Sequence, residues 1–256
     1  MAVGAGHELL VGKRVVVTAA AGTGIGSAVA QRCLEEGAEV LISDIHERRL
    51  DETADRMADA TGTRPHTALC NVTVEADVQA LVGAAVSAMG GIDVMMNNAG
   101  LGGDTNLVDM TDEQWSAVLG VTLDGTMRCT RAVLRHMIAA GTPGAIVNNA
   151  SVVGWRAQAG QCHYAAAKAG VMALTRCSAI EAADHGIRVN AVAPSIAMHA
   201  FLEKVSDADL LDELAGREAF GRAAEPREVA NVMVFLASDL ASYMTGEVVS
   251  VSSQHP

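Results

Sequence analysis

One pattern near the N-terminus constrains the fold: a short apolar run, a glycine-rich turn, a helical stretch and a second apolar run. Residues 14–18 (RVVVT) and 40–42 (VLI) are short and apolar, as strands buried on both faces are. Between them, residues 28–36 place apolar side chains at helical spacing. This order predicts a parallel β-α-β unit whose turn contains Gly22, Gly24 and Gly26.

The unit has the composition of a dinucleotide-binding site. Glycines let the backbone approach a pyrophosphate, and the helix N-terminus faces that group. Asp44 follows the second apolar run, where a carboxylate can accept hydrogen bonds from the hydroxyls of an adenosine ribose. Asp44 would repel a 2′-phosphate, and the glycine turn contains no Arg or Lys, so we expect NAD(H) to be favoured over NADP(H). Arg48 and Arg49 argue against this preference, but we place them on the solvated face of the next helix.

Tyr164 and Lys168 lie four residues apart in HYAAAKAG, and Ser151 ends an apolar run thirteen residues before Tyr164. In a helix, positions i and i+4 share a face about 6 Å apart along the axis. An ammonium beside a phenol favours the phenolate and lowers the phenol pKa, and a serine hydroxyl can hold a substrate oxygen nearby. The three residues predict proton transfer at an alcohol or ketone. Because Tyr-x-x-x-Lys occurs by chance on many surface helices, this interpretation depends on the dinucleotide site as the source of hydride.

Several segments, in this order, resemble motifs of the short-chain dehydrogenase/reductase family. They are TAAAGTGIG (18–26), NNAG (97–100), NNAS (148–151), YAAAK (164–168), RVNAVAP (188–194) and YMTG (243–246), and the resemblance spans about residues 10–251. It implies that Tyr164 is the general acid/base, that Lys168 lowers its pKa and binds the nicotinamide ribose, and that Ser151 positions the carbonyl. It also implies cofactor contacts from Thr18, Gly22, Gly24, Ile25, Gly26, Asp44, Asn71, Val72, Asn98, Ala99, Gly100, Tyr164, Lys168, Pro194, Ile196 and Ala197.

The chain departs from the family pattern at several positions. Ala19 replaces the first glycine of the turn, and the turn is one residue longer. Asn71 replaces an Asp expected to contact adenine. Thr122 stands where the family has its fourth catalytic residue, an Asn, and we expect the Thr122 hydroxyl to contact the water of a proton relay. Because the Ser, Tyr and Lys of the catalytic motif are intact, these changes indicate a distinct subfamily rather than an inactive enzyme. Further differences lie at Ser195, His199 and 252–254.

A closer resemblance concerns the segments SVVGWRAQ, HYAAAKAGVMALTRCSAIEAA and VSSQHP. They are similar to an actinobacterial subfamily of sterol-ring catabolism, whose members interconvert a ring ketone and alcohol on a bicyclic indane-type acyl-CoA. The resemblance implies the same class of substrate here.

Residues 195–222 are the expected substrate lid. Their apolar side chains predict an inner face that suits a bulky apolar ketone or alcohol, although an ordinary amphipathic helix packed on the domain would carry the same pattern. Trp155 is a candidate pocket wall, and His199 is equally a substrate contact or a surface residue. Arg156, Lys204 and Arg217 are candidates to meet CoA phosphates. The apolar residues of the lid are Met198, Phe201, Leu202, Leu210, Leu211 and Leu214.

Bulk composition limits the other possibilities. The 256 residues, 50% of them hydrophobic, suffice for one large core, and alternating strands and helices predict a single-domain, doubly wound α/β (Rossmann) fold over residues 10–256 after a flexible tail at 1–9. The tail does not resemble a signal peptide, and no run is long enough to span a membrane. A net charge of −12 disfavours nucleic-acid partners and anionic membranes.

The cysteines and histidines give weaker indications. Five scattered cysteines are typical of reduced packing residues in a cytoplasmic protein; Cys162, near Tyr164, is the one candidate exception. The eight histidines do not cluster, so no metal site is expected, and we expect His163 to turn away from Tyr164. Helices near 115–137 and 166–181 resemble the dimer helices of the family, which implies a homotetramer or homodimer.

The sequence thus predicts an NAD(H)-dependent alcohol/ketone oxidoreductase. A 3-oxoacyl-thioester reductase using NADPH shares nearly every motif and is the alternative. A non-catalytic regulator that senses dinucleotide is a remote one, since such a protein would not need Tyr164 and Lys168 intact.

Overall fold

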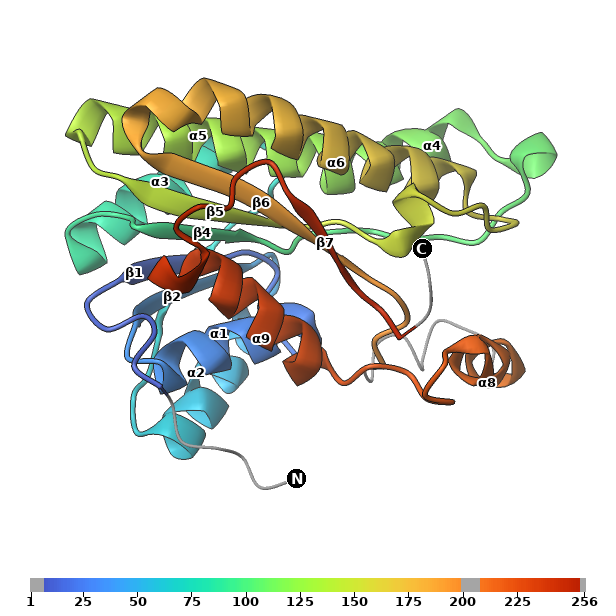
Figure 1. Cartoon of the computed structure of the whole chain (residues 1–256), viewed down its shortest axis with the longest axis horizontal. Helices are drawn as coiled ribbons and strands as arrows, with labels where there is room; N and C mark the ends of the chain where they lie inside the picture. Colours follow the sequence, from blue (N-terminus) through green and yellow to red (C-terminus); the bar gives the residue numbers. More distant parts are fainter. Residues whose placement is uncertain (1–6, 199–207, 254–256) are drawn as a thin grey trace.

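The computed structural model describes residues 7–198 and 208–253, which form a seven-stranded parallel sheet between helices (Figure 1). The strands run in the order β3-β2-β1-β4-β5-β6-β7. Their bounds are β1 Arg14–Val17, β2 Glu39–Asp44, β3 His66–Leu69, β4 Val94–Asn97, β5 Gly144–Asn149, β6 Ile187–Pro194 and β7 Val248–Val251. The α-helices are α1 Ile25–Glu35, α2 Glu47–Thr61, α3 Glu75–Met89, α4 Asp112–Leu119, α5 Gly125–Ala140, α6 Cys162–Ala182, α8 Ala208–Arg217 and α9 Pro226–Ala237.

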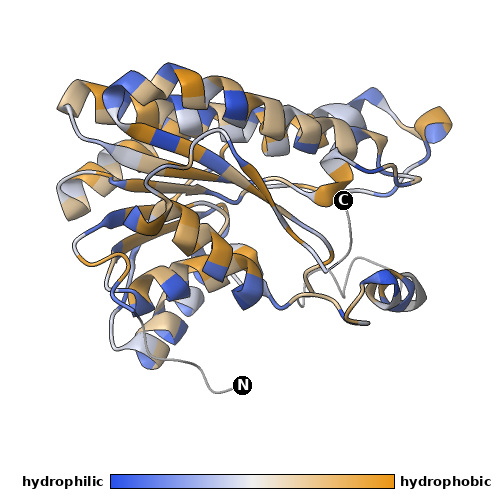
Figure 2. Ribbon diagram, in the orientation of Figure 1, coloured by the Kyte–Doolittle hydropathy of each residue, from blue (hydrophilic) through white to orange (hydrophobic). Residues whose placement is uncertain are grey.

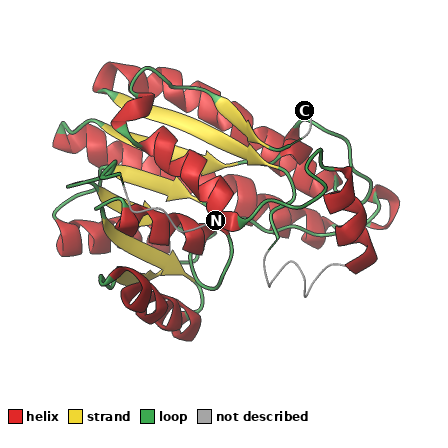
Figure 3. Ribbon diagram, turned by 60° about the horizontal axis from the view of Figure 1, so that its bottom comes forward, coloured by secondary structure: helices red, strands yellow, loops and turns green. Residues whose placement is uncertain are grey.

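The helices cover both faces of the sheet, α3, α5 and α6 on one side and α1, α2 and α9 on the other (Figures 1 and 3). Strand β1 illustrates why the strands must be apolar throughout: Val15 and Val17 belong to the core beneath α1 and α9, whereas Val16 belongs to the core beneath α3 and α5. Successive side chains of a strand point to opposite faces, so a strand covered twice has no polar face. Figure 2 shows this as a largely hydrophobic sheet.

The strand order confirms the doubly wound fold predicted from the sequence. The chain builds β1, β2 and β3 outward in one direction, then crosses back to place β4 beside β1 and continues the other way. The loops after β1 and β4 therefore diverge, and this reversal is where open parallel sheets bind their ligands. Helix α1 begins at Ile25, three residues before the predicted start at 28, so Gly26 lies within its first turn.

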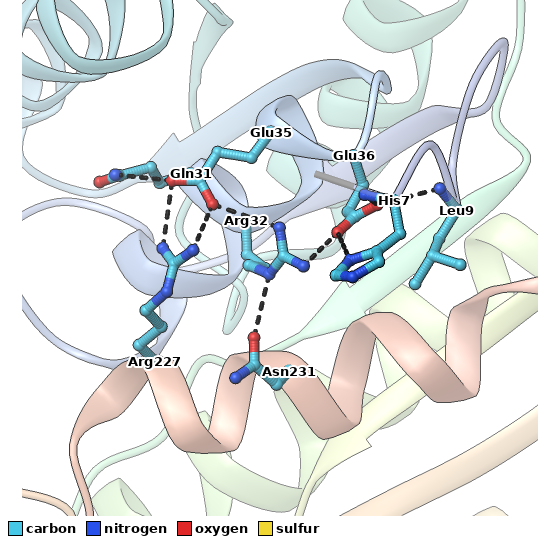
Figure 4. A network of polar contacts seen from close by, with 8 residues as sticks. All are labelled: His7, Leu9, Gln31, Arg32, Glu35, Glu36, Arg227 and Asn231. Carbon is cyan, nitrogen blue, oxygen red and sulfur yellow. Dashed lines mark hydrogen bonds and ion pairs between the residues drawn. The ribbon is translucent and has the colours of Figure 1, made fainter. Parts of the chain in front are cut away.

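A buried polar network ties the N-terminal segment to α1 and α9 (Figure 4). Glu36 is fully buried, pairs with Arg32, and accepts backbone N–H hydrogen bonds from His7 at 2.7 Å and Leu9 at 3.0 Å. The last residues of the predicted flexible tail, 7 and 9, are therefore anchored. From α9, Asn231 accepts a hydrogen bond from Arg32 at 3.0 Å, and Arg227 donates two to Glu35 at 3.1 and 2.6 Å.

Within the described ranges, the structure has no helix long and apolar enough to cross a membrane.

Candidate active site

Ser151, Tyr164 and Lys168 meet at the carboxyl end of β5. Helix α6 carries Tyr164 and Lys168 on one face, and the Lys168 ammonium lies 5.5 Å from the centroid of the Tyr164 ring. Lys168 is 3% exposed and donates a hydrogen bond of 2.5 Å to the carbonyl of Asn149, the last residue of β5. Ser151 follows two residues later and caps a short 3₁₀ turn, Val152–Gly154, by accepting from the N–H of Val153. The spacing in the sequence thus brings the three side chains together.

The pKa values of this group differ from the simplest expectation. Burial raises the pKa of the Tyr164 phenol, and a hydrogen bond with Ser151 opposes this only in part. Burial lowers the pKa of Lys168 to about 8. In the protein alone, the net pKa of Tyr164 is therefore raised, where the sequence analysis expected it to be lowered. The physical reason is that desolvation of the phenolate outweighs the hydrogen bond, while the ammonium is directed to the Asn149 carbonyl rather than to the phenol oxygen.

Thr122 lies in a π-helical turn, Gly120–Asp124, between α4 and α5, and it is fully buried. Its hydroxyl donates to the carbonyl of Leu101 at 3.1 Å and accepts from the N–H of the same residue at 3.0 Å. A β-carbon added to Gly100 would lie 3.8 Å from the Thr122 hydroxyl and 3.5 Å from the Lys168 nitrogen, so the three residues converge. Because its only proton is already donated, Thr122 can offer a relay water one acceptor lone pair, and its evident task is to hold the loop at Leu101.

The glycine turn is closely packed at one end and strained at the other. A β-carbon on Gly26 would lie 2.4 Å from both the Ala19 carbonyl oxygen and the Asn98 side-chain nitrogen, so only glycine fits there. Ala19, which replaces the family glycine, adopts φ +50°. An L-residue in this left-handed region costs roughly 1–2 kcal/mol. Gly22, at φ +98°, has a conformation that suits glycine alone.

Thr18 and Asn98 join the carboxyl ends of β1 and β4. The Thr18 hydroxyl accepts from the N–H groups of Asn98 at 3.0 Å and Ala99 at 3.2 Å. The Asn98 side chain donates to the carbonyls of Thr18 and Ala19 and accepts from Asn149 at 3.0 Å. The NNAG segment thus connects the glycine turn to Asn149, the residue whose carbonyl accepts from Lys168.

A set of buried amide and hydroxyl side chains lies beneath the site. The sequence analysis did not identify these side chains as one network. Asn97 donates to Thr130 of α5 at 3.0 Å and to Asn148 of β5 at 2.8 Å, and Asn148 donates to Thr175 of α6 at 2.9 Å. All four side chains are at most 2% exposed. The sequence did contain an indication of this network, because Asn97 and Asn148 each follow an apolar run. An amide in a buried strand needs hydrogen-bond partners on neighbouring elements.

Asp44 holds the glycine turn from β2. Its carboxylate accepts from the N–H of Ala21 at 3.2 Å and of His46 at 3.1 Å. Burial raises the pKa of Asp44, while the Ala21 hydrogen bond and the charge of Arg49 oppose the rise. Arg48 and Arg49 are both exposed as expected, and Arg48 pairs with Glu52, but the charge of Arg49 reaches Asp44.

The remaining predicted cofactor residues line the same edge of the sheet. Asn71 is exposed after β3, and its side-chain oxygen accepts from the N–H and hydroxyl of Thr73, while Val72 is buried against Gly125. Pro194 ends β6, and its carbonyl lies 3.5 Å from the Ser151 hydroxyl. Ile196 and Ala197 follow it in a short stretch held by Ala224.

The residues present fit a nicotinamide dinucleotide. Gly24, the N-cap residue of α1, provides no side-chain cap, so the first N–H groups of the helix can bind a phosphate. Gly26 leaves room where any β-carbon would clash. Near the other end of the site, the Asn149 side-chain oxygen is buried and has no hydrogen-bond partner among the described residues, which is a place for a ligand or water.

Two loops close over the N-terminal end of α6. Gln161 donates to the carbonyl of Gly103 at 2.6 Å, and the N–H of Thr105 donates to the carbonyl of Gly160 at 2.9 Å. His163 is 1% exposed and packs so closely on Gly103 that a β-carbon there would lie 2.7 Å from the imidazole. His163 thus faces the loop after β4, a role that its sequence neighbours did not reveal.

The predicted lid is described only in part. Helix α8 has Leu211 buried and Leu214 half-buried, which agrees with an apolar inner face. His199, Phe201, Leu202 and Lys204 lie outside the described residues. Arg217 is exposed and already paired with Glu213, so it is a weaker candidate for a CoA phosphate than the sequence suggested. Trp155 is 43% exposed and follows the 3₁₀ turn after Ser151.

Residues 7–198 and 208–253 contain no group of three His, Cys, Asp or Glu side chains that could hold a metal ion. All five cysteines are free thiols; Cys33, Cys70 and Cys129 are buried, and Cys162 and Cys177 are exposed.

The chain is similar to known proteins over nearly its whole length. Residues 19–253 match the family model described as enoyl-(acyl carrier protein) reductase. The chain is 63% identical over 252 residues to the (5R,7aS)-5-hydroxy-7a-methyl-1-oxo-2,3,5,6,7,7a-hexahydro-1H-indene-carboxyl-CoA reductase of Mycobacterium tuberculosis, covering 98% of this chain and 96% of the relative. It is 40% identical over 242 residues to the 3-oxoacyl-(acyl carrier protein) reductase of Thermotoga maritima, covering 94% and 97%.

A solved structure, a short chain dehydrogenase from Mycobacterium smegmatis, has a TM-score of 0.88 and 59% identity, and covers 98% of this chain and 96% of its own. The chain therefore belongs to the short-chain dehydrogenase/reductase family of oxidoreductases.

Proposed function

We propose that this enzyme interconverts a secondary alcohol and a ketone on a bicyclic, indane-type CoA thioester of steroid-ring degradation, using NAD(H). The observation that carries the substrate proposal is the 63% identity to the indene-carboxyl-CoA reductase over nearly the whole chain. The similarity covers 98% of this chain and 96% of the relative.

The catalytic group suits reduction of a ring ketone. A nicotinamide dinucleotide, when bound, supplies or accepts the hydride. Ser151 is placed to donate a hydrogen bond to the substrate oxygen, and Tyr164 gives that oxygen its proton. Burial raises the pKa of Tyr164, so its phenol carries at neutral pH the proton that it would give to the substrate oxygen. Lys168, held by the Asn149 carbonyl, lies beside the ring and stabilises the phenolate that forms.

Asp44 supports NAD(H) over NADP(H). Its carboxylate is half-buried at the end of β2 and holds the turn through Ala21, so a 2′-phosphate there would meet a fixed negative charge. The charge of Arg49 weakens that repulsion.

An NADPH-dependent 3-oxoacyl-thioester reductase is the second candidate, supported by the 40% identity to the Thermotoga maritima enzyme. A dinucleotide sensor without turnover is disfavoured by the assembled Ser151, Tyr164 and Lys168.

Location and assembly are part of the same proposal. Five free thiols favour the reducing cytoplasm. The exposed side chains of Trp115 on α4 and Ile180 on α6, 37% and 79% exposed, favour a homodimer or homotetramer built on these helices.

The deciding experiment measures turnover with NAD(H) and NADP(H) against CoA-linked and free ketones and alcohols, including an indane-type acyl-CoA. We expect the bicyclic CoA thioester with NAD(H) to give the highest kcat/KM. Higher kcat/KM for a linear 3-oxoacyl thioester with NADPH would replace the proposal with the second candidate.

A further inference from the structure

Gly22, in the lengthened glycine turn, directs both of its backbone polar groups to α2. Its N–H donates to the hydroxyl of Thr53 at 2.9 Å, and its carbonyl accepts from the guanidinium of Arg56. The turn between β1 and α1 is thus held by a helix that follows β2, more than thirty residues later in the sequence.

Thr53 is well suited to this contact. It is 1% exposed, and its hydroxyl donates to the carbonyl of Arg49 at 2.7 Å, which leaves its lone pairs for Gly22 and for Arg56 at 3.3 Å. A hydroxyl has one proton and two lone pairs, so all of its capacity is used. The orientation of this side chain is therefore fixed before any ligand arrives.

Arg56 joins three segments. The same guanidinium nitrogen that reaches Gly22 lies 3.4 Å from the hydroxyl of Ser27, in the first turn of α1. Among the described residues, no carboxylate lies within ion-pair distance of Arg56, unlike Arg48 and Arg64 of the same region, which pair with Glu52 and with Asp51 and Asp55. Its positive charge is therefore not neutralised where α1 begins.

We propose that Arg56 and Thr53 act as a brace on the enlarged turn and thereby set the affinity for the dinucleotide. Both are positioning residues, and the inference rests on the proposed dinucleotide site. The first N–H groups of α1 have no side-chain cap and can bind a pyrophosphate, and the conformation of the turn before them decides how a ligand reaches them. Ordering a flexible turn on binding costs conformational entropy, and a turn that is ordered in advance does not incur that cost on binding. Since the pyrophosphate is common to both dinucleotides, the brace strengthens binding of NADH and NADPH alike.

The test compares R56A, R56K and T53V with R48A and R64A, two exposed arginines that do not touch the turn. Dissociation constants for NADH and NADPH are measured by nucleotide fluorescence, kcat and the dinucleotide KM by steady-state kinetics, and stability by thermal unfolding without nucleotide. We expect R56A and T53V to raise both dissociation constants and the KM about tenfold, as loss of a hydrogen bond to a charged or buried group does. We expect kcat to change less than twofold and R56K to recover part of the affinity.

The following results would each overturn the proposed role of Arg56 and Thr53. Unchanged affinity in both R56A and T53V would overturn the brace while leaving the proposed function intact. A loss confined to NADPH would mean that Arg56 serves a 2′-phosphate, which also overturns it. Equal losses in R48A or R64A would mean a general charge effect and count against it too. Failure of the unaltered protein to bind either dinucleotide would overturn the proposed function and, with it, the brace.

Discussion

Glu36 and Lys168 are both almost completely buried, 0% and 3% exposed, yet their surroundings differ in kind. Burial raises the pKa of Glu36, but the N–H groups of Leu9 and His7 and the charge of Arg32 outweigh burial and the net pKa is lowered. Lys168 has the Asn149 carbonyl and the Tyr164 ring, and no described carboxylate lies within ion-pair distance. Burial alone decides, and the pKa of Lys168 falls to about 8.

This difference in surroundings distinguishes Glu36, whose charge has a structural role, from Lys168, whose charge is suited to reaction. Glu36 sits among enough donors to keep its charge across the neutral range, so the α1–α9 network of Figure 4 can connect distant segments. Lys168 holds its proton weakly, which is the condition for taking part in proton transfer. Equal burial thus has opposite consequences, set by whether compensating groups were placed beside the charge.

The sharpest test on the active-site side is Tyr164→Phe. The substitution keeps the ring packed and removes only the proton donor, so we expect turnover to fall about a thousandfold. Dinucleotide affinity and the melting temperature should stay close to those of the unaltered protein. Near-normal kcat would mean that Tyr164 is not the acid/base.

In the α1–α9 network, we expect Glu36→Gln to destabilise the folded protein without lowering its catalytic turnover. It removes the charge that Arg32 pairs with and one acceptor shared by His7 and Leu9, and breaking a buried pair costs about 3 kcal/mol. Denaturant unfolding measures the loss, and kcat at a temperature well below the transition should be unchanged. A stability equal to that of the unaltered protein would show that the network contributes nothing net.

Lys168→Met should act in the opposite sense on stability. The folded pKa of about 8 lies below the ordinary 10.5, so the folded protein binds fewer protons than the unfolded chain between these values. Burial of the charged Lys168 therefore lowers the free energy of unfolding by its full amount below pH 8, and this destabilisation disappears as the pH rises to 10.5. We expect Lys168→Met to be more stable at pH 7 by about 2 kcal/mol, and the gain to shrink toward pH 10, while turnover is lost. Urea unfolding at several pH values checks this, and a gain independent of pH would contradict it.

The smallest expected effect is that of Ala19→Gly. Glycine relieves the left-handed conformation at φ +50° but adds freedom to the unfolded chain, for a net gain of about 0.5–1 kcal/mol. Thermal unfolding measures it, with Ala21→Gly, where the backbone is not left-handed, as the control expected to destabilise. A loss of stability in Ala19→Gly would mean that its methyl group packs usefully.

Local patterns predicted the fold, and the position of Lys168 beside Tyr164, because the patterns that indicate them lie within short segments. The β-α-β unit and the spacing of Tyr164 and Lys168 can each be recognised from a short stretch of sequence. The doubly wound strand order was then expected from the alternation of strands and helices. The contacts that hold the fold and the site are not local. In the α1–α9 network, Arg32 and Asn231 are 199 positions apart, and in the site, Ser151 and Pro194 are 43 apart. Nothing near Thr122 in the sequence indicates that its hydroxyl holds Leu101. The direction of the Tyr164 pKa also escaped prediction, because it depends on how much water the folded surroundings exclude.

The amides of Asn97 and Asn148 separate the reaction from the choice of substrate. They fasten α5 and α6 to the middle of the sheet by hydrogen bonds that involve no residue of the loops around the pocket. Mutations in α8, the described helix of the predicted lid, leave these hydrogen bonds intact, whereas the loop at 101–106 contacts the start of α6 through Gly103 and is less free to change. Related proteins with this fold can therefore differ in the substrate that they bind while keeping the same arrangement of reacting side chains.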